Sequence, residues 1–168
     1  MRSSWYAVHV RSRHEFKVRE SLEAKGIETF LPTVERLRQW KDRKKKVLFP
    51  LFSGYLFVRL EDIESSFLHV VKTSGVLRIL GNGSFFIPVP EDQIQNLYAL
   101  VTSKLPLEDH PYLKEGQRVV ISSGPLRGVK GVLVRKEQER ILVVSVDLIQ
   151  KGVSVKVAAD AVEPLLSE

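Results

Sequence analysis

The residues best suited to chemistry in this sequence are basic and aromatic, and they gather in one stretch. Residues 36–46 (RLRQWKDRKKK) hold seven Lys and Arg, one acid and Trp40. Lys and Arg bind phosphate oxygens, and a tryptophan at a basic tip can stack on an exposed base. The same ring could instead fold back onto its own domain. Like charge at this density argues against burial and predicts a projecting hairpin or loop.

The residues that follow this basic stretch predict a strand with two different faces. Residues 55–60 (YLFVRL) alternate with period two, and alternate residues of a strand point to opposite sides. The even-numbered positions are aliphatic and suit a core, whereas Tyr55, Phe57 and Arg59 share the other face. If helices cover only one side, the aromatic face stays open as an interaction surface. The alternative is that another part of the chain covers Tyr55 and Phe57.

The segments around this strand predict an α+β first domain. Ser12 and Glu15 have the spacing of a helix capping box, and Gly26 suits the residue after the helix. Strands are expected at 5–10, 27–31, 55–60, 76–80 and 85–89, with helices at 13–26, 63–72 and from 91. This order predicts an antiparallel sheet with helices packed mainly on one face.

Composition changes near residue 103 and predicts a second domain. Residues 103–111 (SKLPLEDHP) combine two prolines with mixed charge, which is typical of a linker. Short β-branched runs separated by glycine turns follow, at 117–122, 129–135, 141–146 and 153–157. Such runs predict a small β-barrel. The expected division is a first domain at 1–103, a linker at 104–113 and a second domain at 114–168.

Charge and motif content narrow the class of protein. The net charge of +6 is concentrated in residues 1–60, which hold 14 Lys and Arg against 6 Asp and Glu. A localised basic region attracts polyanions, nucleic acid first. The chain has no cysteine, four scattered histidines and no apolar run long enough for a membrane span. These observations predict a cytoplasmic protein that is not an enzyme and needs no metal or cofactor.

Several motifs match one known family, in the right order along almost the whole chain. They are WYAVHVRSRHEFKVRESLEAKGIETFLP, FPLFSGYLFVRL, TSGVLRILG and IPVPEDQI in the first domain and LKEGQRVVISSGPLRGVKGVLV in the second. They resemble the N-terminal and KOW domains of NusG transcription elongation factors, which implies that the second domain is an SH3-like β-barrel. RQWKDRKKK leading into PLFSGYLFV is most similar to the UpxY paralogues, relatives of RfaH that act as antiterminators on long operons. Ser53 departs from the proline usual in the family.

The resemblance implies two binding surfaces in the first domain. The sheet would dock on the clamp helices of RNA polymerase through an apolar pocket of Phe52, Tyr55, Phe57, Ile94 and Leu97, which favours the open aromatic face. Docking there would bring basic residues near the non-template DNA strand. The candidates are Arg11, Arg13 and Lys17 at a strand–helix junction and Arg36, Arg38, Arg43, Lys44, Lys45 and Lys46 in the hairpin.

The resemblance also implies a partner site in the KOW domain. In the family this domain binds the termination factor Rho, a ribosomal small-subunit protein or RNA. The contacting loop aligns with residues 147–150, so Leu148 and Ile149 would be exposed there. The alternative is that they complete the barrel core.

The implied function is a monomeric antitermination factor that binds the polymerase clamp and suppresses pausing and termination on specific long operons. Two alternatives remain at the level of sequence. One is a housekeeping NusG that couples polymerase to Rho or the ribosome. The other is a ribosome-associated KOW protein that binds RNA.

Overall fold

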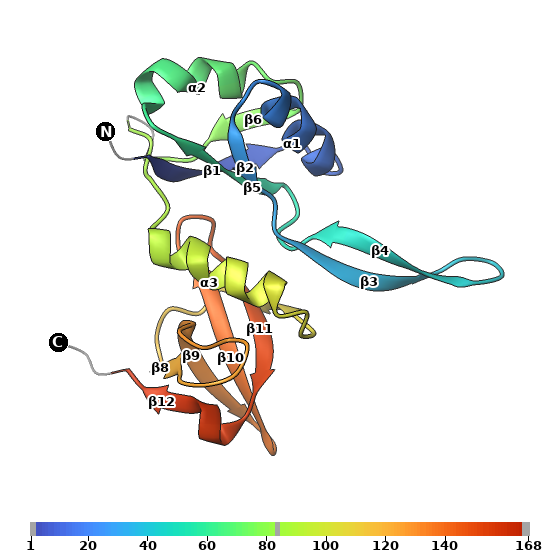
Figure 1. The fold of residues 1–168 in the computed structure, drawn as a ribbon, viewed down its shortest axis with the longest axis vertical. Helices are drawn as coiled ribbons and strands as arrows, with labels where there is room; N and C mark the ends of the chain where they lie inside the picture. The colour runs from blue at the N-terminus through green and yellow to red at the C-terminus, as the bar shows by residue number, and fades with distance from the viewer. Residues whose placement is uncertain (1–2, 83–84, 166–168) are drawn as a thin grey trace. The chain divides into compact units, whose positions relative to one another are not determined.

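The computed structural model describes residues 3–82 and 85–165, and the chain divides into two compact units, Met1–Pro90 and Glu91–Glu168. The first unit contains a four-stranded antiparallel sheet, a two-stranded hairpin and two helices (Figure 1). The second contains one α-helix and a six-stranded antiparallel sheet. The predicted α+β class with a β-rich second part is confirmed. Within the described residues, no helix is long and apolar enough to cross a membrane.

The sheet of the first unit is organised around the strand predicted from the alternating run. Its strand order is β2 (Glu28–Phe30), β5 (Tyr55–Leu60), β1 (Ser4–Val10) and β6 (Val76–Ile79). β5 therefore lies inside the sheet, paired with β1 along its whole length and with β2 on the other side. Helices α1 (Glu15–Ala24) and α2 (Ile63–Val71) both lie over one face of this sheet (Figure 1).

The core of the first unit lies between that face and the helices. Leu56, Val58 and Leu60 of β5 belong to one buried cluster with Val18 and Leu22 of α1. The predicted assignment of the even-numbered β5 residues to the core is confirmed. Burying apolar surface here contributes roughly 25 cal/mol for each Å² removed from water.

The start of α1 differs from the prediction, whereas its end does not. The N-cap residue is His14, which makes no side-chain capping hydrogen bond, so the expected Ser12–Glu15 capping box is wrong. Glu15 is instead buried and bonded elsewhere in the unit. Gly26 follows the helix with φ +80°, in the left-handed region that glycine tolerates.

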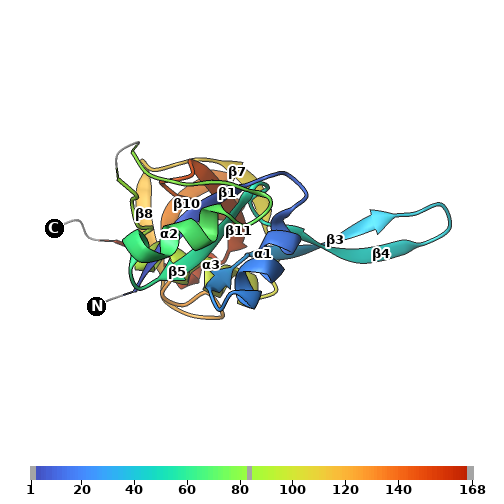
Figure 2. The same ribbon diagram turned by 90° about the horizontal axis from the view of Figure 1, so that it is seen from above.

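The basic stretch forms the projecting hairpin that its charge predicts. Strands β3 (Thr33–Gln39) and β4 (Lys44–Pro50) pair only with each other among the described strands. At the base, the Leu51 amide donates to the Pro32 carbonyl at 2.8 Å, and at the tip the Trp40 amide donates to the Arg43 carbonyl at 2.8 Å. Figures 1 and 2 show the hairpin extending away from the four-stranded sheet of its own unit.

The second unit contains the strands predicted for the barrel and two more. Its strands are β12 (Val162–Pro164), β8 (Gln117–Ile121), β9 (Lys130–Lys136), β10 (Glu139–Val146), β11 (Lys151–Val157) and β7 (Glu108–Pro111), in that order across the sheet, with a 3-10 turn at Ala159–Ala161. β7 lies within the segment expected to be a linker, residues 104–113. Its residues form a strand because their backbone pairs with β11. The strand expected at 85–89 is absent from the described residues there, where only isolated bridges form, from Phe86 to Gly81 and from Val89 to Trp5.

Helix α3 (Glu91–Thr102) groups with the second unit rather than the first. The side-chain amides of Gln93 and Asn96 bind α3 to the second unit. Gln93 donates to a carboxylate oxygen of Asp147 at 3.0 Å and accepts from its amide at 3.3 Å. Asn96 bonds both the amide and the carbonyl of Lys130, each at 3.3 Å. The structural division therefore falls after Pro90, one helix earlier than the predicted boundary at 103.

Candidate binding surfaces

The second face of the four-stranded sheet is aromatic, as the alternation in β5 predicts. Tyr55 lies opposite His9 of β1, Phe57 opposite Ala7 and Arg59 opposite Trp5. Residues directly opposite in an antiparallel pair project to the same side. Phe30 of β2, opposite Phe57, adds another ring to this face.

The rings on this face differ in exposure, which corrects one expectation. Phe57 is 0% exposed, and its ring stacks on Phe30 with centroids 6.1 Å apart. Phe52 is also buried. The expectation of an open face is therefore wrong at Phe57, whereas Tyr55 is only half-buried. The Tyr55 ring stacks on the His9 ring, with centroids 5.0 Å apart and planes at 19°.

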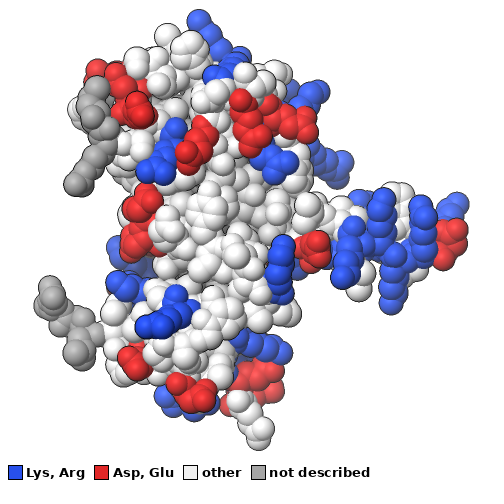
Figure 3. Space-filling model, in the orientation of Figure 1, with Lys and Arg blue, Asp and Glu red and all other residues white. Residues whose placement is uncertain are grey.

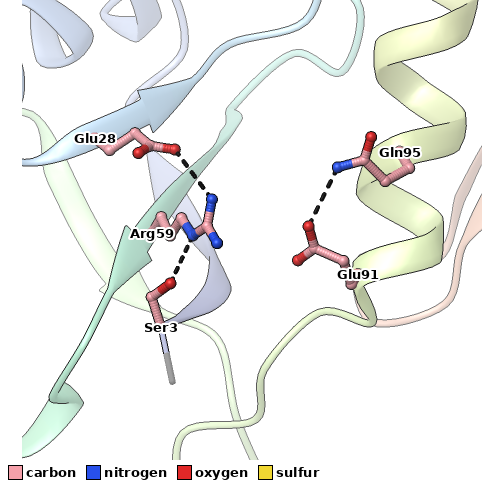
Figure 4. A network of polar contacts seen from close by, with 5 residues as sticks. All are labelled: Ser3, Glu28, Arg59, Glu91 and Gln95. Carbon is pink, nitrogen blue, oxygen red and sulfur yellow. Dashed lines mark hydrogen bonds and ion pairs between the residues drawn. The ribbon is translucent and has the colours of Figure 1, made fainter. Parts of the chain in front are cut away.

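Arg59 lies at the Trp5 end of this face, within a small polar network (Figure 4). Its Nε donates to the Ser3 hydroxyl at 2.7 Å, and its Nη1 lies 3.8 Å from a carboxylate oxygen of Glu28. The guanidinium lies 5.9 Å from the centre of the Trp5 ring. Because the ion pair is largely exposed, it contributes little to stability and serves mainly to orient Arg59.

The buried carboxylate of Glu15, which was expected to cap α1, instead holds the turn before β5. A carboxylate oxygen of Glu15 accepts from the Gly54 amide at 2.9 Å, and the Gly54 carbonyl accepts from the Val10 amide at 2.8 Å. The turn that leads into Tyr55 is therefore fixed to both α1 and β1. The spacing of residues in the sequence could have predicted the burial of Glu15, because Glu15 lies on the same buried stripe of α1 as Val18 and Leu22.

The hairpin brings together all six of its predicted nucleic-acid-binding residues. All six are exposed: Arg36, Arg38, Arg43, Lys44, Lys45 and Lys46. In the space-filling view, Lys and Arg atoms cover most of the hairpin (Figure 3). Trp40 is 50% exposed at the tip, with the Arg38 guanidinium 5.8 Å from its ring centre. The ring therefore does not fold into a core, and a base could reach it.

The other predicted basic residues lie at the turn between β1 and α1. Arg11, Arg13 and Lys17 are all exposed. The Arg11 amide donates to the Gly75 carbonyl at 2.8 Å, which fixes this turn against the start of β6. Arg13 has φ +71°, an uncommon conformation for a residue other than glycine.

The predicted residues of the second unit are mostly buried. Ile94 and Leu97, on the helix that packs there, are 0% exposed. In the loop after β10, Ile149 is buried and Leu148 is half-buried, so the expectation of exposure is wrong for Ile149. Asp147, at the start of this loop, accepts from the Tyr112 hydroxyl at 2.7 Å. That hydrogen bond is the main reason why the pKa of Tyr112 is raised. Burial and the charge of Asp147 raise the pKa further, in that order.

The sequence of this chain is similar to one protein family and to named relatives within it. The family described as "Transcription termination factor nusG" matches residues 3–98. A relative from Staphylococcus carnosus, named transcription termination/antitermination protein NusG, is 31% identical over 96% of this chain and 95% of its own. One of the same name from Chlamydia trachomatis is 30% identical over 77% of this chain and 76% of its own.

A solved structure of a protein with the same family name is also similar to this chain. It is titled "Domain interaction in Thermotoga maritima NusG", and it is similar over 99% of both chains, with 26% identity and a TM-score of 0.56. The family match at residues 3–98 includes the sheet, the hairpin, both helices of the first unit and part of α3.

Proposed function

The chain belongs to the NusG family of transcription elongation and antitermination factors, and we propose that it binds the clamp helices of RNA polymerase and suppresses pausing and termination on specific long operons. In this proposal the first domain comprises residues 1–103, residues 104–113 connect it to the KOW domain, and the KOW domain comprises residues 114–168. The match at residues 3–98 supports including α3 in the first domain.

The proposed polymerase contact comprises five residues: Phe52, Tyr55 and Phe57 of the first unit, and Ile94 and Leu97 of α3. Tyr55 is half-buried and accessible, so its ring can contact a partner directly. The other members are Phe52, Phe57, Ile94 and Leu97, and all are buried in the structure. Binding through those four therefore requires that their surfaces become accessible, and the free energy of that rearrangement lowers the apparent affinity.

The observation that carries the proposal is the basic hairpin, which extends away from the four-stranded sheet of the first unit (Figure 1). A strand of DNA left unpaired by polymerase exposes phosphates and unstacked bases, which are the groups that Lys, Arg and tryptophan bind. The hairpin supplies seven exposed cations, among them all six predicted contacts, and Trp40 on one ribbon. The Arg11, Arg13 and Lys17 cluster supplies a second set of phosphate contacts.

A transcription assay with purified RNA polymerase tests the polymerase contact. We expect the protein to shorten pauses and increase read-through of a terminator, and Tyr55→Ala to abolish both effects while circular dichroism stays unchanged. Tyr112→Ala, which removes a half-buried tyrosine outside the proposed contact, is the matched control. Full activity of Tyr55→Ala would contradict the proposal.

The names of the relatives support one alternative, a housekeeping factor that acts in termination as well as antitermination. Such a factor would couple polymerase to Rho or to a ribosomal small-subunit protein through the KOW domain, with Leu148 in the contacting loop. A pull-down of Rho by the purified chain separates the two functions. Binding that Leu148→Ala weakens would support the housekeeping function, and no binding would support the specialised antiterminator.

A further inference from the structure

The hairpin has two chemically different faces. The pairs Arg36–Val47 and Arg38–Lys45 project to one side, and the pairs Glu35–Leu48 and Leu37–Lys46 project to the other. We call the first side the arginine face and the second the leucine face. The pair Gln39–Lys44 extends the leucine face towards the tip.

The leucine face combines exposed apolar surface with lysines. Leu37 is 65% exposed and Leu48 is 50% exposed. They occupy diagonal positions of the ribbon, where side chains of their length can touch. Lys44 and Lys46 are exposed beside them on the same face. A single exposed leucine is ordinary, but two adjacent ones form a small amphipathic patch, with Lys44 and Lys46 on its tip side and the exposed Glu35 opposite Leu48.

The arginine face has a different chemistry. Its cations are Arg36, Arg38 and Lys45, all exposed, whereas its apolar residues, Val47 and the pair Val34–Phe49 nearer the base, are half-buried. Arg38 also lies 5.8 Å from the Trp40 ring. Guanidinium groups and an aromatic ring fit phosphates and unstacked bases. Nucleic acid can therefore bind all the exposed side chains of this face between residues 36 and 47.

Nucleic acid cannot satisfy the leucine face in the same way. A strand of phosphates and sugars would neutralise Lys44 and Lys46, yet it offers no aliphatic surface on which to bury Leu37 and Leu48. The complement of two leucines with lysines on their tip side is an apolar protein surface with acidic side chains where it meets the lysines. Both occupants could neutralise the lysines, but only the protein surface could also bury the two leucines, and this separates the two candidates.

We propose that the leucine face docks on a protein surface of RNA polymerase in which apolar side chains adjoin Asp and Glu, while the arginine face contacts the nucleic acid. The inference rests on the proposed function, because it assumes that the hairpin reaches polymerase and DNA together. The hairpin would then lie between the two partners, with each face covered by one of them.

Site-specific photocrosslinking tests this assignment, because the chain has no cysteine and a single introduced one is labelled uniquely. Leu37→Cys and Leu48→Cys probe the leucine face, and Arg38→Cys and Lys45→Cys probe the arginine face. Each variant carries a benzophenone maleimide and is bound to a polymerase elongation complex assembled on a DNA–RNA scaffold. Glu163→Cys in β12, which is exposed, is the background control.

We expect the leucine-face probes to crosslink to polymerase protein and the arginine-face probes to the DNA or RNA. Nucleic-acid crosslinks from all four probes would overturn the inference and leave the proposed function intact. Crosslinks from none of the four above the Glu163→Cys background would overturn both.

Affinity measurements supply an independent readout. Leu37→Ser with Leu48→Ser should weaken binding to the elongation complex about tenfold, a change of about 1.4 kcal/mol, without changing its salt dependence. Arg38→Gln with Lys45→Gln should lower the slope of log K against log salt by about 1.4, because each single-strand phosphate that a cation neutralises adds roughly 0.7 to that slope. A slope that falls equally in the leucine variant would overturn the inference.

Discussion

Strands β4 and β5 are neighbours in the chain, yet they have opposite environments. β5 lies between two strands, with helices over one of its faces, and five of its six residues are buried or half-buried. β4 has one partner strand, and four of its seven residues are exposed. The difference lies in composition, because three consecutive lysines begin β4 whereas aliphatic residues fill every second position of β5.

This contrast indicates that the two strands divide two tasks between them. β5 fixes the fold, since its aliphatic residues complete the core of the first unit. β4 contributes little to that core and is available for partners, since its exposed side chains face water. Substitutions of the aliphatic residues in β5 should therefore act on stability, and substitutions in the hairpin should act on binding.

The largest expected effect compares the same substitution in the two strands. Leu56→Ala in β5 removes a fully buried side chain and should lower the free energy of unfolding by about 2–5 kcal/mol. Leu48→Ala in β4 removes a half-exposed one and should change it by less than about 0.5 kcal/mol. Urea unfolding followed by circular dichroism measures both. Equal losses would show that the hairpin is part of the cooperative core.

The next effect concerns the turn that joins the two strands. Glu15→Ala leaves the Gly54 amide without its buried acceptor and should cost about 1–3 kcal/mol of unfolding free energy. Glu20→Ala, at an exposed position of the same helix, is the control and should be nearly neutral. Urea unfolding again provides the measurement, and a neutral Glu15→Ala would mean that the turn is held without the carboxylate.

A binding effect of similar size is expected at the tip of the hairpin. Trp40→Ala should weaken binding to single-stranded DNA by about 1–3 kcal/mol, because stacking on one base contributes about that much. The free energy of unfolding should stay the same, since the ring is half exposed. Trp40→Phe keeps a stacking surface and should retain part of the affinity. Fluorescence anisotropy with a labelled oligonucleotide measures the three proteins, and a loss of stability in Trp40→Ala would contradict the division of tasks.

The smallest effect is expected away from both strands, at a polar contact of the second unit. The hydrogen bond to Asp147 raises the pKa of Tyr112 above its ordinary value of 10.0, so folding favours the neutral phenol. The stabilisation is therefore present below about pH 10 and is lost as the pH rises through the raised pKa of the folded protein. Unfolding curves between about pH 8 and 11 should show a steeper decline for the natural chain than for Tyr112→Phe. Identical declines would mean that the hydrogen bond does not persist in solution.

Local patterns predicted the elements whose stability comes from nearby residues. Period-two alternation predicted β5 with its correct ends, and charge density predicted the hairpin, because repulsion among lysines disfavours burial in any context. The helix predicted at 63–72 forms at Ile63–Val71, where the Asp62 side chain accepts from the Glu64 amide at its start. These features depend on a few adjacent residues, so a single sequence is enough to predict them.

The features that sequence missed depend on distant partners. Glu15 has the spacing of a capping box but bonds Gly54, which is remote in the chain. Residues 108–111 have the composition of a linker but form β7, because the edge of β11 is available to pair with them. Phe57 is buried although its face was expected to be open. In each case the decisive partner lies outside the local window.

The pairing of the hairpin also limits how such an arm can change its reach. Its base is fixed by the bond between residues 51 and 32, so any change of length must occur nearer the tip. Adding one residue to each strand would rotate the Trp40 turn to the opposite side, because side chains alternate. Only an addition of two per strand would restore its orientation, and each such step would move the tip outward by about 7 Å. Variants of this arm that preserve the function of the tip should therefore come in discrete lengths.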